Sequence, residues 1–473
     1  MIYFKSLIGG REKRIVLQPL GYGCALSLFL FFAACVSTVI CIHYFHENLT
    51  GILLLVDFQI LVSAWLVFLT YKLKRRNFTF SSGFWLVVNI LLYIVVKSFY
   101  LENDELLVFF RFYPYIILFF LAFVGGLSFT MPSRTRLFIP LPELYPTKRK
   151  LLRLILIFFI IKLLSYILRR IFAGSADTTL EVVAQTQNQG MSYLFNISLI
   201  GNFVFYMILY VAYAYRKWQK AAVLMSVIFV IDCILSASRT QIVIFLLANC
   251  FFYDKYIQKI KFVYLLILTP VIIFIISFFG MVRNIEIGDM HTYLSVFSDF
   301  SDDTGLILDL FIKRLDMLPV MLNAYSDLQA GHIKHLYGLS YLYMFLHAIP
   351  RNIWPGKPML SAALITSEVS PDLFSAGINL YCSVIIEAMM NFGLFGVVLS
   401  GFVIGRLGRM FDRFKDSRNG YKVLVYIVFF TFPMGLFNEG FHSNYISVML
   451  YQLFLIGVTI LLVNLRYTTD GKS

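Results

Sequence analysis

The chain has 473 residues, of which 59% are hydrophobic, 17% aromatic and only 14% charged, and its formal net charge is +14. Since soluble domains carry about 25% charged residues, this composition excludes one water-soluble core and indicates a chain embedded in a lipid bilayer. The number of domains therefore cannot be estimated from the chain length, because the structural unit is a helix that spans the bilayer.

Apolar stretches of about 20 residues recur along the chain and predict about twelve transmembrane helices, which defines an all-α polytopic membrane protein. The first stretch follows a basic N-terminus and is interpreted as a retained signal anchor. The seventh and eighth are short enough to be tilted or to be joined by a tight turn. The predicted spans are 21–43, 51–71, 80–100, 113–132, 151–171, 191–214, 221–237, 241–254, 262–282, 380–405, 421–437 and 445–465.

Lysine and arginine residues lie on alternate loops along the chain, in a pattern that never changes phase. The loops between them are poor in charge or acidic, as in 101–107 (LENDELL). Since cytoplasmic loops of membrane proteins are rich in Lys and Arg, the basic loops and both termini are expected in the cytoplasm. This distribution accounts for the net positive charge and excludes a nucleic-acid-binding protein. The basic loops are 72–76, 134–153, 216–220, 255–261 and 406–422.

One outer loop, residues 283–379, is much longer than the others. Amphipathic helices are expected at 301–315 and 338–350, lying on the membrane surface, and the proline-rich IPRNIWPGKP (349–358) predicts a rigid turn. The chain is thereby divided into three parts: nine spans in 1–282, the outer loop 283–379, and three spans with a cytoplasmic tail in 380–473.

Several arginines lie at the outer rim, where the distribution of positive charge predicts few cations. One of them, in ILSASRTQIVIFLL (234–247), falls in the tight turn between the seventh and eighth spans. Arginine presents a planar fork of donors that matches phosphate oxygens two at a time, so converging arginines would bind a pyrophosphate. The alternative for each one is a local ion pair or a side chain that reaches the interface. The outer arginines are Arg169, Arg170, Arg239, Arg283, Arg314 and Arg351.

Three further side chains are candidates for acid–base chemistry or for contact with a sugar. Glu387 lies in SVIIEAMMNFG (383–393), and Glu439 and His442 lie in the outer turn FNEGFHSN (437–444). A partly buried carboxyl or imidazole could remove a proton from a sugar hydroxyl. Alternatively, each acid neutralises an arginine, or Glu439 and His442 simply face water.

Other kinds of site are not indicated by the sequence. It contains no Walker loop, no GxGxxG and no HExxH, so no nucleotide, cofactor or metal is expected. The acids of ENDE (102–105) and SDD (301–303) fit solvated loop acids or a helix cap better than a metal site. The six cysteines lie in or beside apolar runs without metal-ligand spacing, and are expected to be packing residues.

Four features, in this order, resemble bacterial oligosaccharide repeat-unit polymerases, the Wzy-type enzymes of O-antigen, enterobacterial common antigen and capsule assembly. They are the SRT turn, the outer loop ending in IPxxxWPGKP, the NFGLFG start of the next span and the final NEG turn. The resemblance covers most of the chain from Leu151 onward. It implies a glycosyltransferase of the bacterial inner membrane, with a GT-C-like helical architecture similar to that of O-antigen ligases and an active site on the periplasmic face.

The reaction that the resemblance implies moves a growing glycan from its undecaprenyl pyrophosphate carrier onto the end sugar of a new lipid-linked repeat unit. Arg239, Arg283, Arg314 and Arg351 match the arginines that grip the donor pyrophosphate, and no nucleotide sugar is needed. The implied partners are undecaprenyl-pyrophosphate-linked glycans, membrane lipids, a chain-length regulator and a flippase. Three alternatives stay open: an O-antigen ligase, a flippase for lipid-linked oligosaccharides, and a noncatalytic assembly partner. Flippases tend to consist of two similar halves, and no such repeat is visible here.

Overall fold

The structure of the protein is a computed structural model. Its description here covers residues 3–8, 11–16, 49–73, 80–129, 144, 147–173, 193–235, 239–260, 262–282, 311–312, 315–346, 354, 356–375, 379–380, 382–442 and 444–464. The expected first span, 21–43, and most of the expected helix at 301–315 lie outside these residues.

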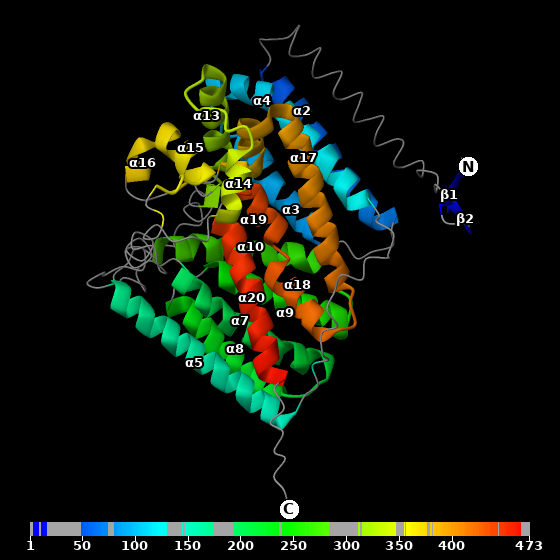
Figure 1. The fold of residues 1–473 in the computed structure, drawn as a ribbon, viewed down its shortest axis with the longest axis vertical. Helices are drawn as coiled ribbons and strands as arrows, with labels where there is room; N and C mark the ends of the chain where they lie inside the picture. Colours follow the sequence, from blue (N-terminus) through cyan, green and yellow to red (C-terminus); the bar gives the residue numbers. More distant parts are fainter. Residues whose placement is uncertain are drawn as a thin grey trace, which may run out of the picture.

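The described residues are mostly helical (Figure 1). They depart from an all-α fold in one antiparallel strand pair, β1 (Tyr3–Ile8) and β2 (Arg11–Val16), in which Tyr3 lies opposite Val16. In chain order the helices are α2 (Leu49–Leu73), α3 (Ser82–Ile90), the π-helix η1 (Leu91–Val96), α4 (Asn103–Ser128), α5 (Lys148–Ala173), α7 (Tyr193–Ala214), α8 (Gln219–Leu235), α9 (Arg239–Tyr256), α10 (Phe262–Val282), α13 (Met317–Ala330), α14 (Leu339–Leu346), α15 (Ser361–Val369), α16 (Pro371–Ser375), α17 (Ser383–Lys415), α18 (Gly420–Phe429), α19 (Phe432–Glu439) and α20 (Asn444–Asn464).

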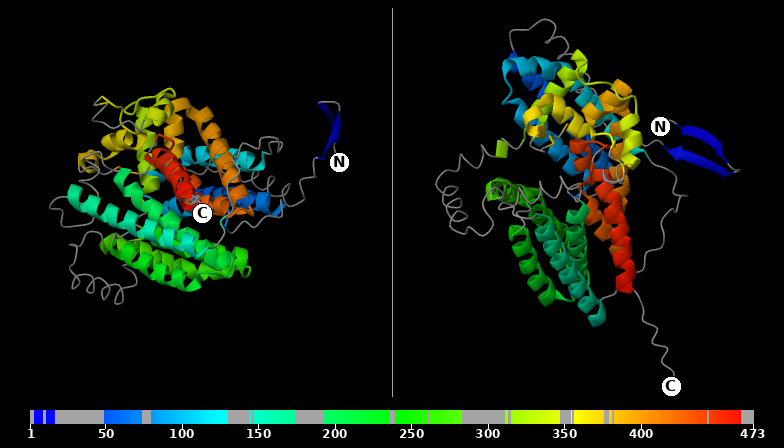
Figure 2. Two further views of the ribbon diagram at one scale, coloured as in Figure 1. Left: turned by 60° about the horizontal axis from the view of Figure 1, so that its bottom comes forward. Right: turned by 60° about the vertical axis from the view of Figure 1, so that its left-hand side comes forward.

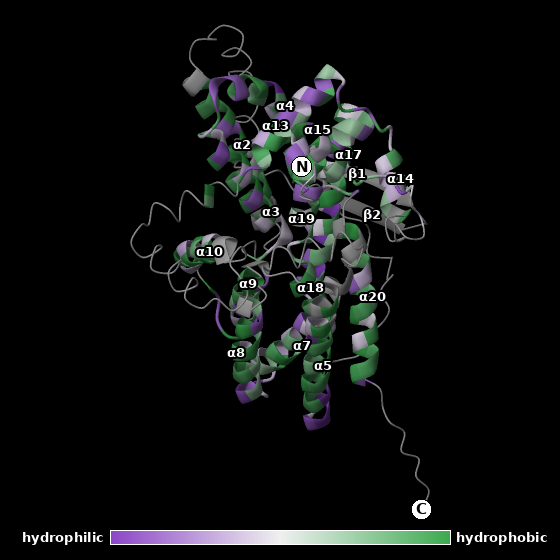
Figure 3. Ribbon diagram, turned by 90° about the vertical axis from the view of Figure 1, so that its left-hand side faces the viewer, coloured by the Kyte–Doolittle hydropathy of each residue, from purple (hydrophilic) through white to green (hydrophobic). Residues whose placement is uncertain are grey.

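Four stretches of the described chain are long and apolar enough to cross a membrane: Gly51–Leu69, Asn103–Ser128, Ser383–Lys415 and Gly420–Glu439. Shorter apolar helices occupy Ser82–Val96, Ile200–Ala214 and Met449–Asn464. Large apolar side chains are exposed on α5, α8 and α20, and Figure 3 shows hydrophobic residues along these helices. Water would disfavour such surfaces whereas lipid would not, so the structure is that of a helical membrane protein.

Each expected span after the first contains a helix, with two informative differences in the boundaries. The helix expected at 113–132 already begins at Asn103, because Glu102 and Glu105 form a capping box in which the N–H of Glu102 donates to Oε2 of Glu105 at 3.1 Å. The acids of ENDE are therefore a helix cap. The expected span 421–437 is divided into α18 and α19 at Phe430 and Thr431, with Pro433 in the first turn of α19.

The outer loop is more ordered into helices than the sequence indicates. Its expected second amphipathic piece contains α14, but α13, α15 and α16 are additional. Helix α13 packs against α4, α15 and α17, and its N-terminal Asp316 forms an ion pair of 2.8 Å with Lys97 at the end of η1. The described part of this loop is therefore attached to the spans.

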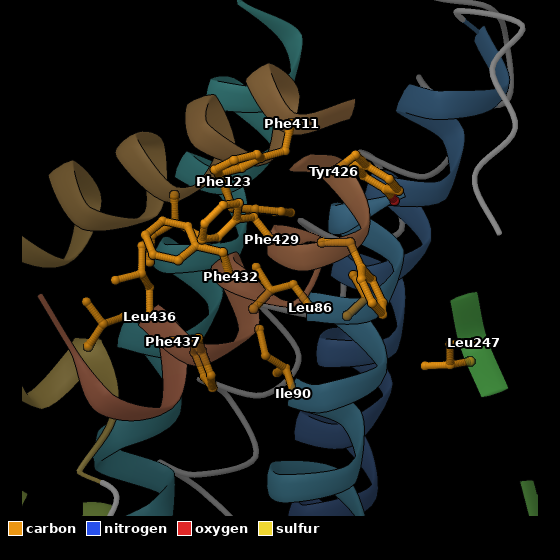
Figure 4. Packing of buried hydrophobic residues seen from close by; sticks show 14 of the residues in the cluster. Leu86, Ile90, Phe123, Leu247, Phe411, Tyr426, Phe429, Phe432, Leu436 and Phe437 are labelled. Atoms are coloured by element: carbon orange, nitrogen blue, oxygen red, sulfur yellow. The ribbon is translucent and has the colours of Figure 1, made fainter. Parts of the chain in front are cut away.

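The centre of the bundle is the close packing of α4 against α17. A Cβ atom at Gly126, Gly401 or Gly405 would collide with a backbone carbonyl of the opposite helix, so glycine sets the short distance between the two helices. Beside this contact, aromatic side chains of α17, α18 and α19 meet Leu86 and Ile90 of α3 (Figure 4). The rings of Phe411 and Phe432, for example, lie 5.6 Å apart.

Loops that the charge pattern assigns to the same side of the membrane contact one another. Helices α13 to α16 gather at one end of the molecule, and the start of α5 meets the end of α20 at the other end (Figure 1; Figure 2, right). Lys150 Nζ is 3.0 Å from Asn464 Oδ1, Lys255 donates to the carbonyls of Lys415 and Ser417, and the N–H of Ser82 donates to Asp412 Oδ1.

Candidate functional site

The carboxylate of Glu387, in the first half of α17, is fully buried and accepts four hydrogen bonds. Its Oε2 accepts from the N–H of Phe441 at 2.5 Å, and its Oε1 accepts from the N–H of His442 at 2.8 Å. Oε1 also accepts from the hydroxyls of Ser361 at 3.2 Å and Ser340 at 3.4 Å. These donors favour the charged form of the carboxylate, whereas its complete burial opposes it.

The donors come from elements that are distant in the sequence. Ser340 lies in α14, Ser361 opens α15, and Phe441 and His442 follow α19. Asn391 extends the network, because its Nδ2 donates to Ser340 Oγ at 2.7 Å and its Oδ1 accepts from the N–H of Gly338 at 3.0 Å. The group is named here the polar hub: Glu387, Ser340, Ser361, Asn391, Phe441 and His442.

The imidazole of His442 is buried, and its Nδ1 lies 3.3 Å from Ser361 Oγ. A serine hydroxyl has one proton, so when Ser361 donates to Glu387 it can only accept from His442. That arrangement places the histidine proton on Nδ1 and leaves Nε2 as the acceptor atom of the ring. The Tyr343 ring lies 6.1 Å from this imidazole, between ring centres.

Helix α17 is interrupted just beyond Glu387. Phe392 and Gly393 have non-helical backbone angles, and Gly393 has φ 56° and ψ −139°, a region open essentially to glycine alone. Every residue of 383–391 is buried, whereas Leu394 and Phe395 beyond the break are 53% and 69% exposed. The NFG motif thus separates a half-helix inside the protein from a half-helix with an apolar outer surface. Broken helices are a common way to present polar groups at membrane depth.

The NEG turn supplies the other wall of the hub. Gly440 has φ 85°, and a Cβ atom there would collide with the Glu387 carboxylate, so the turn requires glycine. Asn438 is fixed by Asn89 of α3, whose Nδ2 donates to it at 2.6 Å. Glu439 is partly buried and makes no hydrogen bond or ion pair with the part of the chain that the structure describes.

The three acid–base candidates therefore differ in their surroundings. Glu387 and His442 are brought together through Ser361, as parts of one network. Glu439 lies two residues before Phe441, at the end of α19, outside that network. Burial raises the pKa of the Tyr341 hydroxyl, with the charge of Glu387 as a second cause, so this group beside the hub remains a neutral donor.

The arginine prediction falls on residues whose side chains the structure does not describe. Arg169 and Arg170 lie in the last turns of α5, and Arg239 is the first residue of α9, but the structure describes only their backbone. The other three, Arg283, Arg314 and Arg351, lie outside the described residues. Their convergence on one anion thus remains a prediction.

Sequence reasoning did not single out Ser340, Ser361 or Asn391. Two of them could have been found from the motifs, since Ser361 closely follows WPGKP and Asn391 is the first residue of NFG. Burial, more than any nearby charge, raises the pKa of the Cys382 thiol, which stays protonated and packs at the start of α17. Among the described residues, no group of His, Cys, Asp and Glu could hold a metal ion.

Comparisons of the chain with protein-family models, with curated proteins and with solved structures find no match. The reactions that the site could support are therefore inferred from its own side chains. The site offers a fixed carboxylate, a buried imidazole next to Ser361, and a second carboxyl whose oxygens have no partner in the described residues.

Proposed function

We propose that the protein polymerises oligosaccharide repeat units that are linked to undecaprenyl pyrophosphate, at the periplasmic face of the bacterial inner membrane. The growing glycan is transferred from its carrier to the end sugar of a new repeat unit, within a GT-C-like bundle of about twelve spans. One observation carries this proposal: residues in or next to three motifs of the family resemblance meet around Glu387. Asn391 of NFG donates to its backbone carbonyl, while Ser361, just after WPGKP, and Phe441, just after NEG, donate to its carboxylate.

The transfer needs little from the protein beyond placement and charge. The bond between the anomeric carbon and the pyrophosphate oxygen breaks, the acceptor hydroxyl oxygen bonds to that carbon, and its proton passes to a base. The departing pyrophosphate gains negative charge, which guanidinium groups can stabilise in a site that excludes water. Arg239 and Arg283 are assigned to this role, with Arg169, Arg170, Arg314 and Arg351 completing the anion site.

The two carboxyl groups take different roles. Glu387 is a positioning residue, because its oxygens are already occupied by four donors and no part of it is exposed. Glu439 is assigned as the base, since it is partly exposed at the same turn and its carboxyl is not held by the described residues. His442 is buried too and is held by Ser361, so contact of its ring with the acceptor sugar stays a prediction.

Two features support a transfer reaction at one face of the membrane: the apolar helices, and the contacts between loops that the charge pattern assigns to the same side. The long outer loop packs on α4 and α17 through α13, and its Ser340 and Ser361 reach the hub, so a covering segment is joined to the site. A flippase would need two alternating openings, for which symmetric halves are the usual solution.

Glycans on the cell surface of a strain without the gene would test the assignment. A polymerase predicts single repeat units attached to lipid A, whereas a ligase predicts no attached glycan. A flippase predicts that repeat units do not reach the outer face. Restoration of the glycan ladder by the wild-type gene, but not by Arg239→Ala at equal membrane abundance, would support the proposal. A ladder that persists without the gene would refute it.

A further inference from the structure

A charged pair lies among the apolar helices of the α5–α9 region, away from the polar hub. Lys162, in the middle of α5, places Nζ 2.7 Å from Asp232 Oδ2 of α8 and 2.8 Å from Asn202 Oδ1 of α7. The Lys162 side chain is 11% exposed and that of Asp232 is 33% exposed. One ammonium group thus joins three helices.

A glycine and two aromatic rings pack closely around the Lys162 side chain. Gly201 of α7 lies against its methylene groups, and a Cβ atom there would be 3.0 Å from Cε of Lys162. The rings of Phe158 and Phe229 flank the ammonium group at 5.9 and 5.7 Å from their centres. The opposite face of α5 exposes large apolar side chains, among them Ile160 and Leu164.

Stability alone is a weak reason for such a pair. Desolvation of two charges offsets most of their attraction, and well-packed apolar side chains of similar volume hold helices together as well or better. Ionisable groups inside membrane helices are consequently associated with function. The location of the pair indicates which function it serves.

Lys162 lies two helical turns before Arg169 of the proposed anion site, and Asp232 lies three residues before the end of α8, the helix that precedes Arg239 in the chain. In α5, the seven residues from Lys162 to Arg169 rise about 10 Å along the helix axis. Next to Asp232, Cys233 Sγ lies 3.8 Å from Gln241 Oε1, which connects α8 to the start of α9.

We propose that Lys162 and Asp232 are positioning residues that fix the outer end of α5, carrying Arg169 and Arg170, against the start of α9, carrying Arg239. This inference rests on the proposed function, because it concerns the pyrophosphate site assigned there. A hydrogen-bonded charge pair fixes the axial register of two helices, which apolar packing specifies less strictly. A shift of one residue moves a helix end by about 1.5 Å and turns it by about 100°, which would separate arginines that act on one anion.

Inorganic pyrophosphate binding by the purified, detergent-solubilised protein tests the proposal. The variant Lys162→Met/Asp232→Leu removes both charges and should fold, because no charge is left unpaired and only a neutral group, the buried Asn202 amide, loses its hydrogen bond from Lys162. It is expected to unfold at a temperature near that of the wild type but to bind pyrophosphate at least about tenfold more weakly, since misplacement by about 1 Å can reduce an oriented interaction that much. Asp232→Asn keeps an acceptor oxygen for Lys162 and is expected to retain most of the affinity.

Asp57→Leu is a matched control. Asp57 is also buried in an apolar helix, α2, where Ser98 Oγ lies 3.2 Å from its Oδ2. Its replacement should alter stability without altering pyrophosphate affinity. If the double variant binds as tightly as the wild type, Lys162 and Asp232 have only a structural role and the proposed function stands. If the wild type itself does not bind pyrophosphate, both proposals fail.

Discussion

Replacement of Glu387 by glutamine is the most informative single change in the polar hub. Glutamine keeps the shape of the side chain but exchanges one acceptor oxygen for an NH2 group. The N–H groups of Phe441 and His442 approach different oxygens and cannot rotate away, so the amide must face one of them donor to donor. The serine hydroxyls can reorient, and they contribute little to the loss.

The magnitude follows from this geometry. One hydrogen bond to a charged acceptor is lost, at about 1.5–3 kcal/mol, and one buried N–H is left unsatisfied, at about 1–3 kcal/mol. We therefore expect Glu387→Gln to lower the free energy of unfolding by about 2.5–6 kcal/mol. Titration of the purified protein in mixed micelles with a denaturing detergent, followed by tryptophan fluorescence, measures this quantity.

Glu439→Gln is the control for this measurement, since it makes the same chemical change at a carboxyl with no partner in the described residues. It should not lower the unfolding free energy, because no described hydrogen bond is lost and a partly buried amide costs less to desolvate than a carboxylate. A Glu387→Gln protein as stable as the wild type would mean that the four-donor arrangement is absent from the folded protein.

Three further outcomes are expected. Gly393→Ala should destabilise the protein by about 1–3 kcal/mol in the same titration, because its backbone region excludes a Cβ; Gly457→Ala, in an ordinary helix with open space around it, should not. In a chain-extension assay Glu439→Gln should reduce the rate by about 100-fold or more with donor affinity retained, as loss of a base does, and an unaltered rate would remove it from that role. Arg239→Lys should extend chains poorly, since a point charge lacks the guanidinium fork; normal extension would contradict bidentate binding.

Hydropathy is sufficient to predict where most of the described helices lie, because a span needs a fixed length of apolar sequence. It could not predict the interruption of α17, since NFG lies inside an apolar run and glycine is tolerated in membrane helices. Helix α13 was missed for a related reason: its sequence, MLPVMLNAYSDLQA, is short and contains a proline.

The candidate site was predictable only in its parts. Glu387 and His442 were identifiable as ionisable residues next to spans, but their connection through Ser361 depends on contacts between segments 26 to 81 residues apart. Local patterns carry no information about such pairs. The different roles of Glu387 and Glu439 likewise follow from burial and hydrogen bonding, which the sequence does not contain.

Reconstitution of the purified protein with undecaprenyl-pyrophosphate-linked repeat units, without any other protein, tests the central claim most directly. Glycans are separated by size, and released carrier pyrophosphate is quantified, with and without a chelator. The account predicts a ladder of polymers, one carrier released for each repeat unit added, and the same rate with the chelator, because guanidinium groups stabilise the leaving group. Repeat units that remain single while the protein is folded would contradict it.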